Sequence, residues 1–348
     1  GSLSGEHGDG RLRGAFIPMM VGDANYQLFK RVKKTWDPKN IFNPNKIVDT
    51  PAMNTSLRYE PDIAVKTIES VFNFTDKGGI LRAAEKCNGS GDCRKLPLSG
   101  GTMCPSYQAT RNEKDSTRAR ANTLREFLTK SEKQNPFDHK EIKEVMDLCL
   151  SCKACTSECP SNVDMSTLKA EFLHQYYKTN GIPLRARAFA YINEFNKLGG
   201  IIPGAYNFFL TNPLLSTLTK KVLGIAPKRS IPTIHKFSLR KWYKKNYNYK
   251  EADNGTVYLF CDEFTNYYDV QVGIDAYELL TRLGYEVLVV DHEESARAYI
   301  SKGFLEEAKA IANKNVAIFS TIITADCPLI GIEPSAILTF RDEYIRLA

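Results

Sequence analysis

The sequence predicts an α+β protein of several domains, in which a helical domain holds most of the cysteines and a small α/β domain follows it. Three observations support this class. The chain has 348 residues, which is enough for two or three domains. Seven of its nine cysteines lie between residues 87 and 159. From residue 256 onward, short apolar runs alternate with helical patterns, which is typical of a parallel sheet covered by helices.

The first block, residues 1–49, contains apolar side chains at helical spacing that predict a helix over residues 25–34. A polar linker flanked by prolines follows at residues 50–61. We expect no targeting segment here, because the N-terminal GSLSGEHGDGRL lacks an apolar core.

The cysteine-rich domain is predicted to span residues 62–194 and to be entirely helical. One helix is expected over residues 114–130, between two cysteine motifs. Another begins after Pro160, with Asp164 as its N-cap and Asn180-Gly181 as its stop signal.

Residues 195–255 are predicted to form a basic, amphipathic connector. The net charge of the chain is +7, yet residues 195–250 contain eleven Lys and Arg residues and no Asp or Glu. Its apolar residues, and the basic residues around Trp242, allow two interpretations: peripheral contact with an anionic membrane surface, or packing over acidic parts of the same chain. We expect no nucleic-acid partner, because no recognition motif accompanies the charge.

The last domain, residues 256–348, is predicted to be a small Rossmann-like α/β unit. The apolar runs 257–260, 286–290 and 330–332 alternate with predicted helices at 270–283, 293–300, 304–317 and 335–347. Cys261 and Cys327 are expected to be ordinary buried cysteines of this domain.

The segment CLSCKACTSECP places Cys149, Cys152, Cys155 and Cys159 at the spacing C-x2-C-x2-C-x3-C, followed by Pro160. This spacing is typical of a 4Fe-4S cluster, in which three thiolates of one loop bind one cluster and the fourth serves a neighbouring cluster. A structural zinc site is the alternative, although zinc sites more often pair two separated C-x2-C units.

An upstream segment, CNGSGDCRKLPLSGGTMCPSYQ, holds Cys87, Cys93 and Cys104, the last of which also precedes a proline. By the same crossing of ligands, we expect Cys104 to complete the cluster of the first three downstream cysteines. Cys159 would then join Cys87 and Cys93. That second group has three thiolates, so it is a cluster with an unusual fourth ligand, a three-iron cluster, or an empty glycine-rich loop with spectator thiols.

Clustered thiols also favour a reducing compartment over a disulfide scaffold. No stretch approaches 18 uninterrupted apolar residues, so no transmembrane helix is expected. We therefore expect a cytoplasmic protein, with peripheral contact at the inner face of the membrane as an open alternative.

The segment SGEHGDGR sets Glu6 and His7 among glycines that permit close approach of a ligand. Histidine is the side chain best suited to accept a proton near neutral pH. Together with VKKTWDPKNIFNPNKIV further on, this segment resembles the end of the C-terminal domain of FAD-linked oxidases. That vanillyl-alcohol-oxidase-like group contains D-lactate, glycolate and D-2-hydroxyglutarate dehydrogenases.

The cysteine-rich domain and the tail resemble the iron–sulfur subunit of glycolate oxidase and the domain it shares with heterodisulfide reductase. The fused order resembles the large bacterial FAD/FMN-containing dehydrogenases. The tail departs from these relatives, because it has no Cys-Cys-Gly motif and Ala336 stands where a cysteine is common. We therefore expect no thiol-based site in the tail.

The resemblance implies roles for two residues. Glu6 would be a ligand of a divalent metal, usually zinc, and His7 the base that removes the hydroxyl proton while hydride passes to the flavin. The other metal ligands and the FAD-binding domain lie upstream in the family, and no G-x-G-x-x-G or P-loop replaces them here. We expect a fragment that alone binds no FAD and oxidises no substrate.

The sequence therefore predicts the iron–sulfur electron-transfer portion of an FAD-dependent 2-hydroxy-acid dehydrogenase. Its partners would be the missing FAD-binding region and a quinone or cytochrome that accepts electrons. A stand-alone iron–sulfur subunit of a separate flavoprotein is one alternative, although it would not need SGEHGDGR. A structural zinc-binding module is another.

Overall fold

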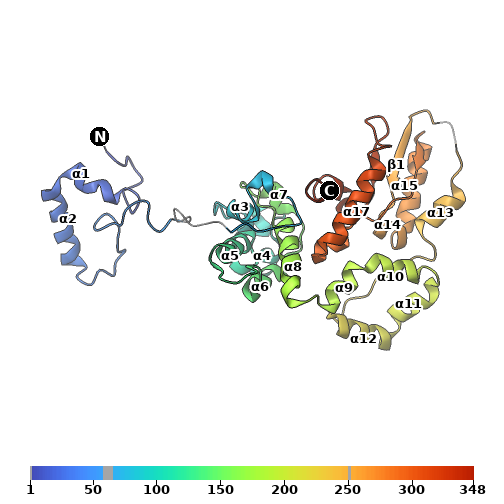
Figure 1. Ribbon diagram of the computed structural model, residues 1–348, viewed down its shortest axis with the longest axis horizontal. Coiled ribbons are helices and arrows are strands. Elements are labelled where there is room, and N and C mark those ends of the chain that lie inside the picture. The colour runs from blue at the N-terminus through green and yellow to red at the C-terminus, as the bar shows by residue number, and fades with distance from the viewer. Residues whose placement is uncertain (1, 58–65, 250–251) are drawn as a thin grey trace. The chain divides into compact units, whose positions relative to one another are not determined.

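The computed structural model describes residues 2–57, 66–249 and 252–348 (Figure 1). The chain forms two compact units, residues 1–65 and 66–348. Part of the predicted linker, the predicted boundary at residue 62, and residue 250 lie outside the described residues. The predicted class is confirmed in its coarse form: the described residues are mostly helical and form one small parallel sheet.

Within residues 2–57, the first unit forms the α-helices α1 (Ile17–Val21) and α2 (Asp23–Trp36). The helix predicted over residues 25–34 is confirmed as α2. Its first turn carries an acidic residue and its last turn basic ones, which suits the helix macrodipole. None of the residues of α2 is buried, and Trp36 is 81% exposed. The apolar side chains of α2 are therefore not covered by the described part of the chain.

The cysteine-rich part of the second unit is helical, as predicted. Its helices are α3 (Ile80–Glu85), α4 (Pro105–Thr110), α5 (Thr117–Lys130), α6 (Lys140–Asp147), α7 (Ala154–Glu158) and α8 (Met165–Asn180). The predicted start of α5 at residue 114 is three residues early, because Ser116 is the N-cap and accepts a hydrogen bond from the Ala119 N–H at 3.1 Å. The predicted N-cap of α8 is confirmed, since Asp164 accepts from Thr167 N–H at 3.1 Å.

The predicted connector is largely helical. It contains most of α10 (Ile192–Gly199) together with α11 (Pro203–Thr211), α12 (Pro213–Leu223) and α13 (Leu239–Asn246), whereas α9 (Leu184–Ala190) ends before it. A proline in the first turn of α11 and of α12 favours helix initiation, and the Asn212 side chain caps α12. No helix in the described part of the chain combines the length and apolar character needed to cross a lipid bilayer.

The last part holds the sheet, whose strands are β1 (Thr256–Phe260), β2 (Glu286–Leu288) and β3 (Leu329–Gly331). All pairs are parallel in the order β2-β1-β3, and β1 is central. The associated helices are α14 (Glu263–Tyr267), α15 (Val270–Arg282), α16 (Arg297–Lys302), α17 (Leu305–Phe319), α18 (Pro334–Ile337) and α19 (Tyr344–Leu347).

Two predicted helices in this part are wrong in extent. The helix predicted over residues 293–300 begins only at Arg297, because Ser295 instead donates from its N–H and Oγ to the buried Glu263 carboxylate, at 2.9 and 2.6 Å. The helix predicted over residues 335–347 is interrupted by a 3-10 turn at Leu338–Phe340 and by an irregular segment before α19.

One hydrophobic core joins the cysteine-rich helices to the end of the chain. It includes Leu168 and Phe172 of α8 together with Ile300 of α16 and Leu305 of α17. The turn between α16 and α17 lies against α8 so closely that a Cβ on Gly303 would be 2.6 Å from the Cβ of Leu173. The cysteine-rich part and the tail therefore share their packing, although residues 195–255 separate them in sequence.

Candidate cluster-binding site

Four cysteines from two distant segments line one cavity. Cys104 precedes α4, Cys149 follows α6, and Cys152 and Cys155 lie at the start of α7, yet all four face the same space. Cys104 and Cys155 are buried, whereas Cys152 is exposed. The thiols that the sequence analysis assigned to one cluster are therefore placed together.

The backbone around this cavity is unusually strained. Cys104, Ser151 and Lys153 all have positive φ, at 55°, 54° and 64°. The left-handed region is unfavourable for residues other than glycine, and such residues gather where function requires a particular turn. Lys153 also fixes the loop from outside, through ion pairs with Asp342 at 2.7 Å and Glu343 at 3.0 Å.

Two cations lie beside the cavity. Arg120 is 1% exposed and donates to the Val145 carbonyl at 2.7 Å and to Ser106 Oγ at 3.0 Å. Lys169 donates to the carbonyl of Cys149, and burial lowers the pKa of Lys169 to about 8. Positive charge in a buried site offsets the negative charge of thiolate ligands and of the group they bind.

The N-terminus of α5 reaches both groups of cysteines. The Thr117 N–H donates to Cys104 Sγ at 3.1 Å, and the Arg118 N–H donates to Cys93 Sγ at 3.4 Å. The Thr117 hydroxyl lies 2.9 Å from the same Cys104 sulfur. The first N–H groups of a helix have no partner within the helix and carry partial positive charge, so they stabilise thiolates.

Cys93 and Cys104 also interact directly. The Cys104 thiol, together with the N–H of Arg118, lowers the pKa of Cys93 to about 6, while the same contact and burial raise the pKa of Cys104. Cys87 is buried near them, and the half-buried Cys159 packs against the same core. The membership of Cys159 in the second group stays a prediction.

The residues around the cavity fit an iron–sulfur cluster. Four thiols surround one space, tight turns hold their loop, and buried cations balance their charge. Within residues 2–57, 66–249 and 252–348, no three His, Cys, Asp or Glu side chains are placed to hold one metal ion together. The cysteines of a 4Fe-4S cluster bind separate irons, so they need not converge on one point.

The N-terminal pair lies in an irregular segment of the first unit. His7 Nε2 is 2.9 Å from Glu6 Oε1, and the two side chains are 79% and 84% exposed. The described residues place no group of three or more His, Cys, Asp or Glu side chains around Glu6. Its role as a metal ligand and that of His7 as a base therefore stay predictions from the resemblance.

A polar cavity at the end of β1 was not foreseen from the sequence. Arg240, Cys261, Glu263, His292 and Glu294 line it. Burial lowers the pKa of His292 to about 3 and raises that of Glu294 to about 8. Its place outside the carboxyl ends of parallel strands is the one signal that could have indicated it.

The two cysteines of the tail differ in burial. Cys261 is buried, as predicted, and its N–H donates to His292 Nε2 at 3.1 Å. Cys327 is only half-buried, because it lies in the irregular segment before β3.

Comparison with known proteins assigns two parts of the chain. Residues 1–47 match the C-terminal domain of FAD-linked oxidases, and residues 86–164 match a 4Fe-4S dicluster domain. These matches confirm the resemblance drawn from SGEHGDGR and from the cysteine motifs, and they support iron–sulfur clusters and FAD as cofactors. No solved structure matches the chain.

Curated relatives align with nearly the whole chain. A D-2-hydroxyglutarate dehydrogenase of Escherichia coli (strain K12) is 28% identical over 99% of this chain and 38% of the relative. The enzyme of the same name from Pantoea ananatis is 28% identical over 100% of the chain and 38% of the relative, and that of Haemophilus influenzae is 26% identical over 99% and 37%. The chain thus spans less than two fifths of the length of these relatives.

Proposed function

We propose that this chain is the iron–sulfur electron-transfer portion of an FAD-dependent 2-hydroxy-acid dehydrogenase. The observation that carries the proposal is the cavity lined by Cys104 and the three cysteines of the downstream loop. The match of residues 1–47 to FAD-linked oxidases supports the link to a flavin domain on the same polypeptide. The names of the relatives favour D-2-hydroxyglutarate over D-lactate and glycolate as the substrate.

The residues of the cavity would hold the cluster in a site that excludes most water. When bound, a 4Fe-4S cluster supplies reversible one-electron transfer. Cys104, Cys149, Cys152 and Cys155 would be its ligands. Buried Arg120 and half-buried Lys169 would stabilise added negative charge, and the Thr117 N–H of α5 would do the same at Cys104.

We propose that His7 and Glu6 act at the substrate end of the longer protein. His7 would take the hydroxyl proton of the acid, and Glu6 would bind the divalent cation that holds the substrate. The rest of that centre is not supplied by the described residues. A quinone or cytochrome would receive the electrons.

A surface on α10–α12 supports our further proposal of peripheral contact with an anionic membrane. These helices and the turn between α10 and α11 expose Phe195, Leu198, Ile201, Ile202, Phe208, Phe209, Leu214, Leu218 and Val222. Lys221, Lys228 and Arg229 are exposed on or just after α12, in a segment with no acidic residue. Apolar side chains beside basic ones are typical of proteins that rest on anionic lipid.

The Trp242 region does not share this role. Leu239 and Tyr243 of α13 are buried, and Trp242 packs against the core that contains Val270 and Ile274. Arg240 and Lys244 both lie 3.6 Å from Asp291. This end of the basic segment therefore packs over acidic groups of its own chain, which was the other interpretation of its charge.

Anaerobic quantitation of iron and sulfide, combined with EPR, tests the main proposal. We expect brown protein with about four irons per chain for one cluster and about eight for two. Colourless protein with zinc and no iron would replace the proposal with the structural zinc module.

The link to the flavin domain has a separate test in the longer protein. His7→Ala should abolish oxidation of D-2-hydroxyglutarate and leave the iron content unchanged, because His7 lies outside the cysteine-rich part. Unchanged oxidation would instead favour a stand-alone iron–sulfur subunit.

Flotation with vesicles tests the membrane proposal. The protein should bind vesicles that contain phosphatidylglycerol and should not bind vesicles of phosphatidylcholine alone. Leu214→Ser combined with Phe208→Ser should weaken binding to the vesicles. Trp242→Ser should leave binding to the vesicles unchanged, because Trp242 packs against a core of its own chain. Equal recovery from both kinds of vesicle would contradict the proposal.

A further inference from the structure

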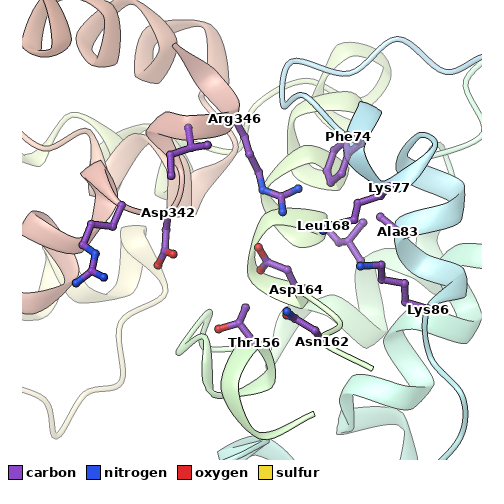
Figure 2. A pocket seen from close by; sticks show the side chains of 12 residues that line it. Phe74, Lys77, Ala83, Lys86, Thr156, Asn162, Asp164, Leu168, Asp342 and Arg346 are labelled. Carbon is purple, nitrogen blue, oxygen red and sulfur yellow. The ribbon is translucent and has the colours of Figure 1, made fainter. Parts of the chain in front are cut away.

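A polar cavity of about 370 Å³ lies next to the cysteine-rich loops (Figure 2). Three separated segments build it within the second unit. Lys77 and Lys86 come from either side of α3, Asn162 and Asp164 from the segment before α8, and Arg346 from α19. Its volume is in the range of cavities that bind small molecules.

Three cationic side chains point toward one another across this cavity. Figure 2 shows the ends of Lys77, Lys86 and Arg346 directed into the same space. Lys77 and Lys86 flank α3 and both line the cavity. Cations held together in this way repel one another unless an anion lies between them.

The acidic residues nearby already have partners. Asp76 forms an ion pair with Lys77 at 2.7 Å and lies 3.7 Å from Arg346 Nη1, which is too far for a hydrogen bond. That nitrogen of Arg346 is buried and has no hydrogen-bond partner among the described residues. A buried charged donor without an acceptor destabilises the folded protein, so an anion that accepts from this nitrogen would be bound favourably.

The two carboxylates of the lining, Asp164 and Asp342, already have partners. Asp164 caps α8 through Thr167, and Asp342 pairs with Lys153 at 2.7 Å. No carboxylate forms an ion pair with Lys86 in the part of the chain that the structure describes. The lining therefore holds four cations, Lys77, Lys86, Arg341 and Arg346, against the carboxylates of Asp164 and Asp342. Among the described residues, Asp76 pairs with Lys77 and Arg346 from outside the lining.

We propose that this cavity binds a compact dianion, either a small organic dicarboxylate or a phosphate group. Two ammonium groups and the planar guanidinium of Arg346 would each take a share of the two negative charges. The Asn162 amide lies in the same lining and would donate to one of the remaining oxygens. A monoanion would neutralise only part of the excess charge and should bind more weakly.

The place of this site connects it to the cysteine groups. Lys86 is adjacent to Cys87, and Asn162 follows Cys159 by three residues. A bound dianion would therefore lie beside the segments that carry the second group of thiols. The site does not depend on the proposed electron transfer, because its residues lie outside the cavity of Cys104 and Cys149.

Isothermal titration calorimetry on the anaerobically purified, cluster-loaded protein tests the site. Inorganic phosphate and glutarate are titrated separately, with acetate as the monoanion. We expect saturable binding of at least one dianion, and at least tenfold weaker binding of acetate. Tighter binding of phosphate or of glutarate shows whether the cavity prefers a phosphate group or a dicarboxylate. No saturable binding of either dianion would overturn the proposal.

Matched variants locate the binding. Lys86→Gln and Arg346→Gln should each weaken binding of the dianion at least tenfold, because each removes a charged donor. Lys140→Gln is the control, since Lys140 is exposed on α6 and is not part of the cavity. Equal affinity in all three variants would place the anion elsewhere.

A measurement on the unmodified sequence covers the case in which a variant does not fold. The protein is treated with an amine-reactive acylating reagent, with and without phosphate or glutarate, and labelled lysines are quantified by mass spectrometry. The dianion should protect Lys77 and Lys86 severalfold and leave Lys140 unprotected. Equal labelling with and without the dianion would contradict the site.

Discussion

The downstream and upstream cysteine segments have related spacings but different chemistry. The downstream loop reads Cys149-x2-Cys152-x2-Cys155, whereas the upstream segment reads Cys87-x2-Ser90-x2-Cys93. Ser90 thus stands where the downstream loop has its exposed cysteine. The downstream loop makes its turns with Ser151 and Lys153 at positive φ, and the upstream segment uses Gly89 and Gly91.

This difference indicates which group of cysteines is held in the more fixed geometry. The downstream loop accepts strained residues and is tied by Lys153 to the end of the chain, and its thiols share a cavity with Cys104. The upstream segment turns on glycines, which adopt positive φ without strain but are less ordered in the unfolded chain. We infer that the downstream group holds its cluster more firmly, and the predictions below test this ranking.

The largest effect is expected from Cys155→Ala. This change removes a buried thiol from the downstream cavity and should cost about four irons per chain together with the matching EPR signal. Cys327→Ala is the control, because Cys327 lies outside both groups, and should retain all the iron. Full iron content in Cys155→Ala would contradict the assignment.

Cys93→Ala should have a smaller effect. The downstream cavity keeps its four thiols, so about four irons per chain should remain and only iron bound upstream should be lost. The measurement is again iron content with EPR. If all iron disappeared, the two groups would depend on each other, and the contact of Cys93 with Cys104 would be the reason.

Ser90→Cys should strengthen the upstream group. It restores the C-x2-C-x2-C spacing and adds a thiolate, so loss of iron to a chelator should become severalfold slower upstream and stay unchanged downstream. Ser99→Cys, in the same segment but outside the repeated spacing, serves as the control. Equal rates in both variants would show that residue 90 does not face the cluster.

Lys169→Met should lower the reduction potential of the downstream cluster by tens of millivolts, because a nearby positive charge favours the reduced, more negative state. Lys178→Met, on the exposed side of the same helix, should shift it much less. Redox titration followed by EPR measures both. A rise in potential would contradict the electrostatic role of Lys169.

The smallest effect is expected from Thr117→Val. The variant loses the hydroxyl that lies 2.9 Å from Cys104 Sγ but keeps the backbone N–H donor. One hydrogen bond fewer should destabilise the negative sulfur by about 1 kcal/mol, and the potential should fall slightly. The same redox titration measures this shift, which should be smaller than that of Lys169→Met.

Much of the fold could be predicted because its signals are local. The helix at α8 was predicted from Asp164 and Asn180-Gly181, and both ends are as expected. The helices of residues 184–223 were not predicted individually, because their exposed apolar side chains give no clear pattern of one buried face. The break before α19 was missed because Glu343 is buried and paired with Lys153 and Arg297, which no local pattern reveals.

The sequence by itself determined the spacing of the cysteines, because ligands two or three residues apart are brought together by a single loop. It also determined the FAD-linked oxidase motif at the N-terminus. Only the tertiary structure decided that the N–H groups of α5 meet both Cys93 and Cys104, that α16 packs on α8, and that Arg346 faces Lys86. These contacts join residues far apart in the chain, so they depend on how the helices pack rather than on local spacing.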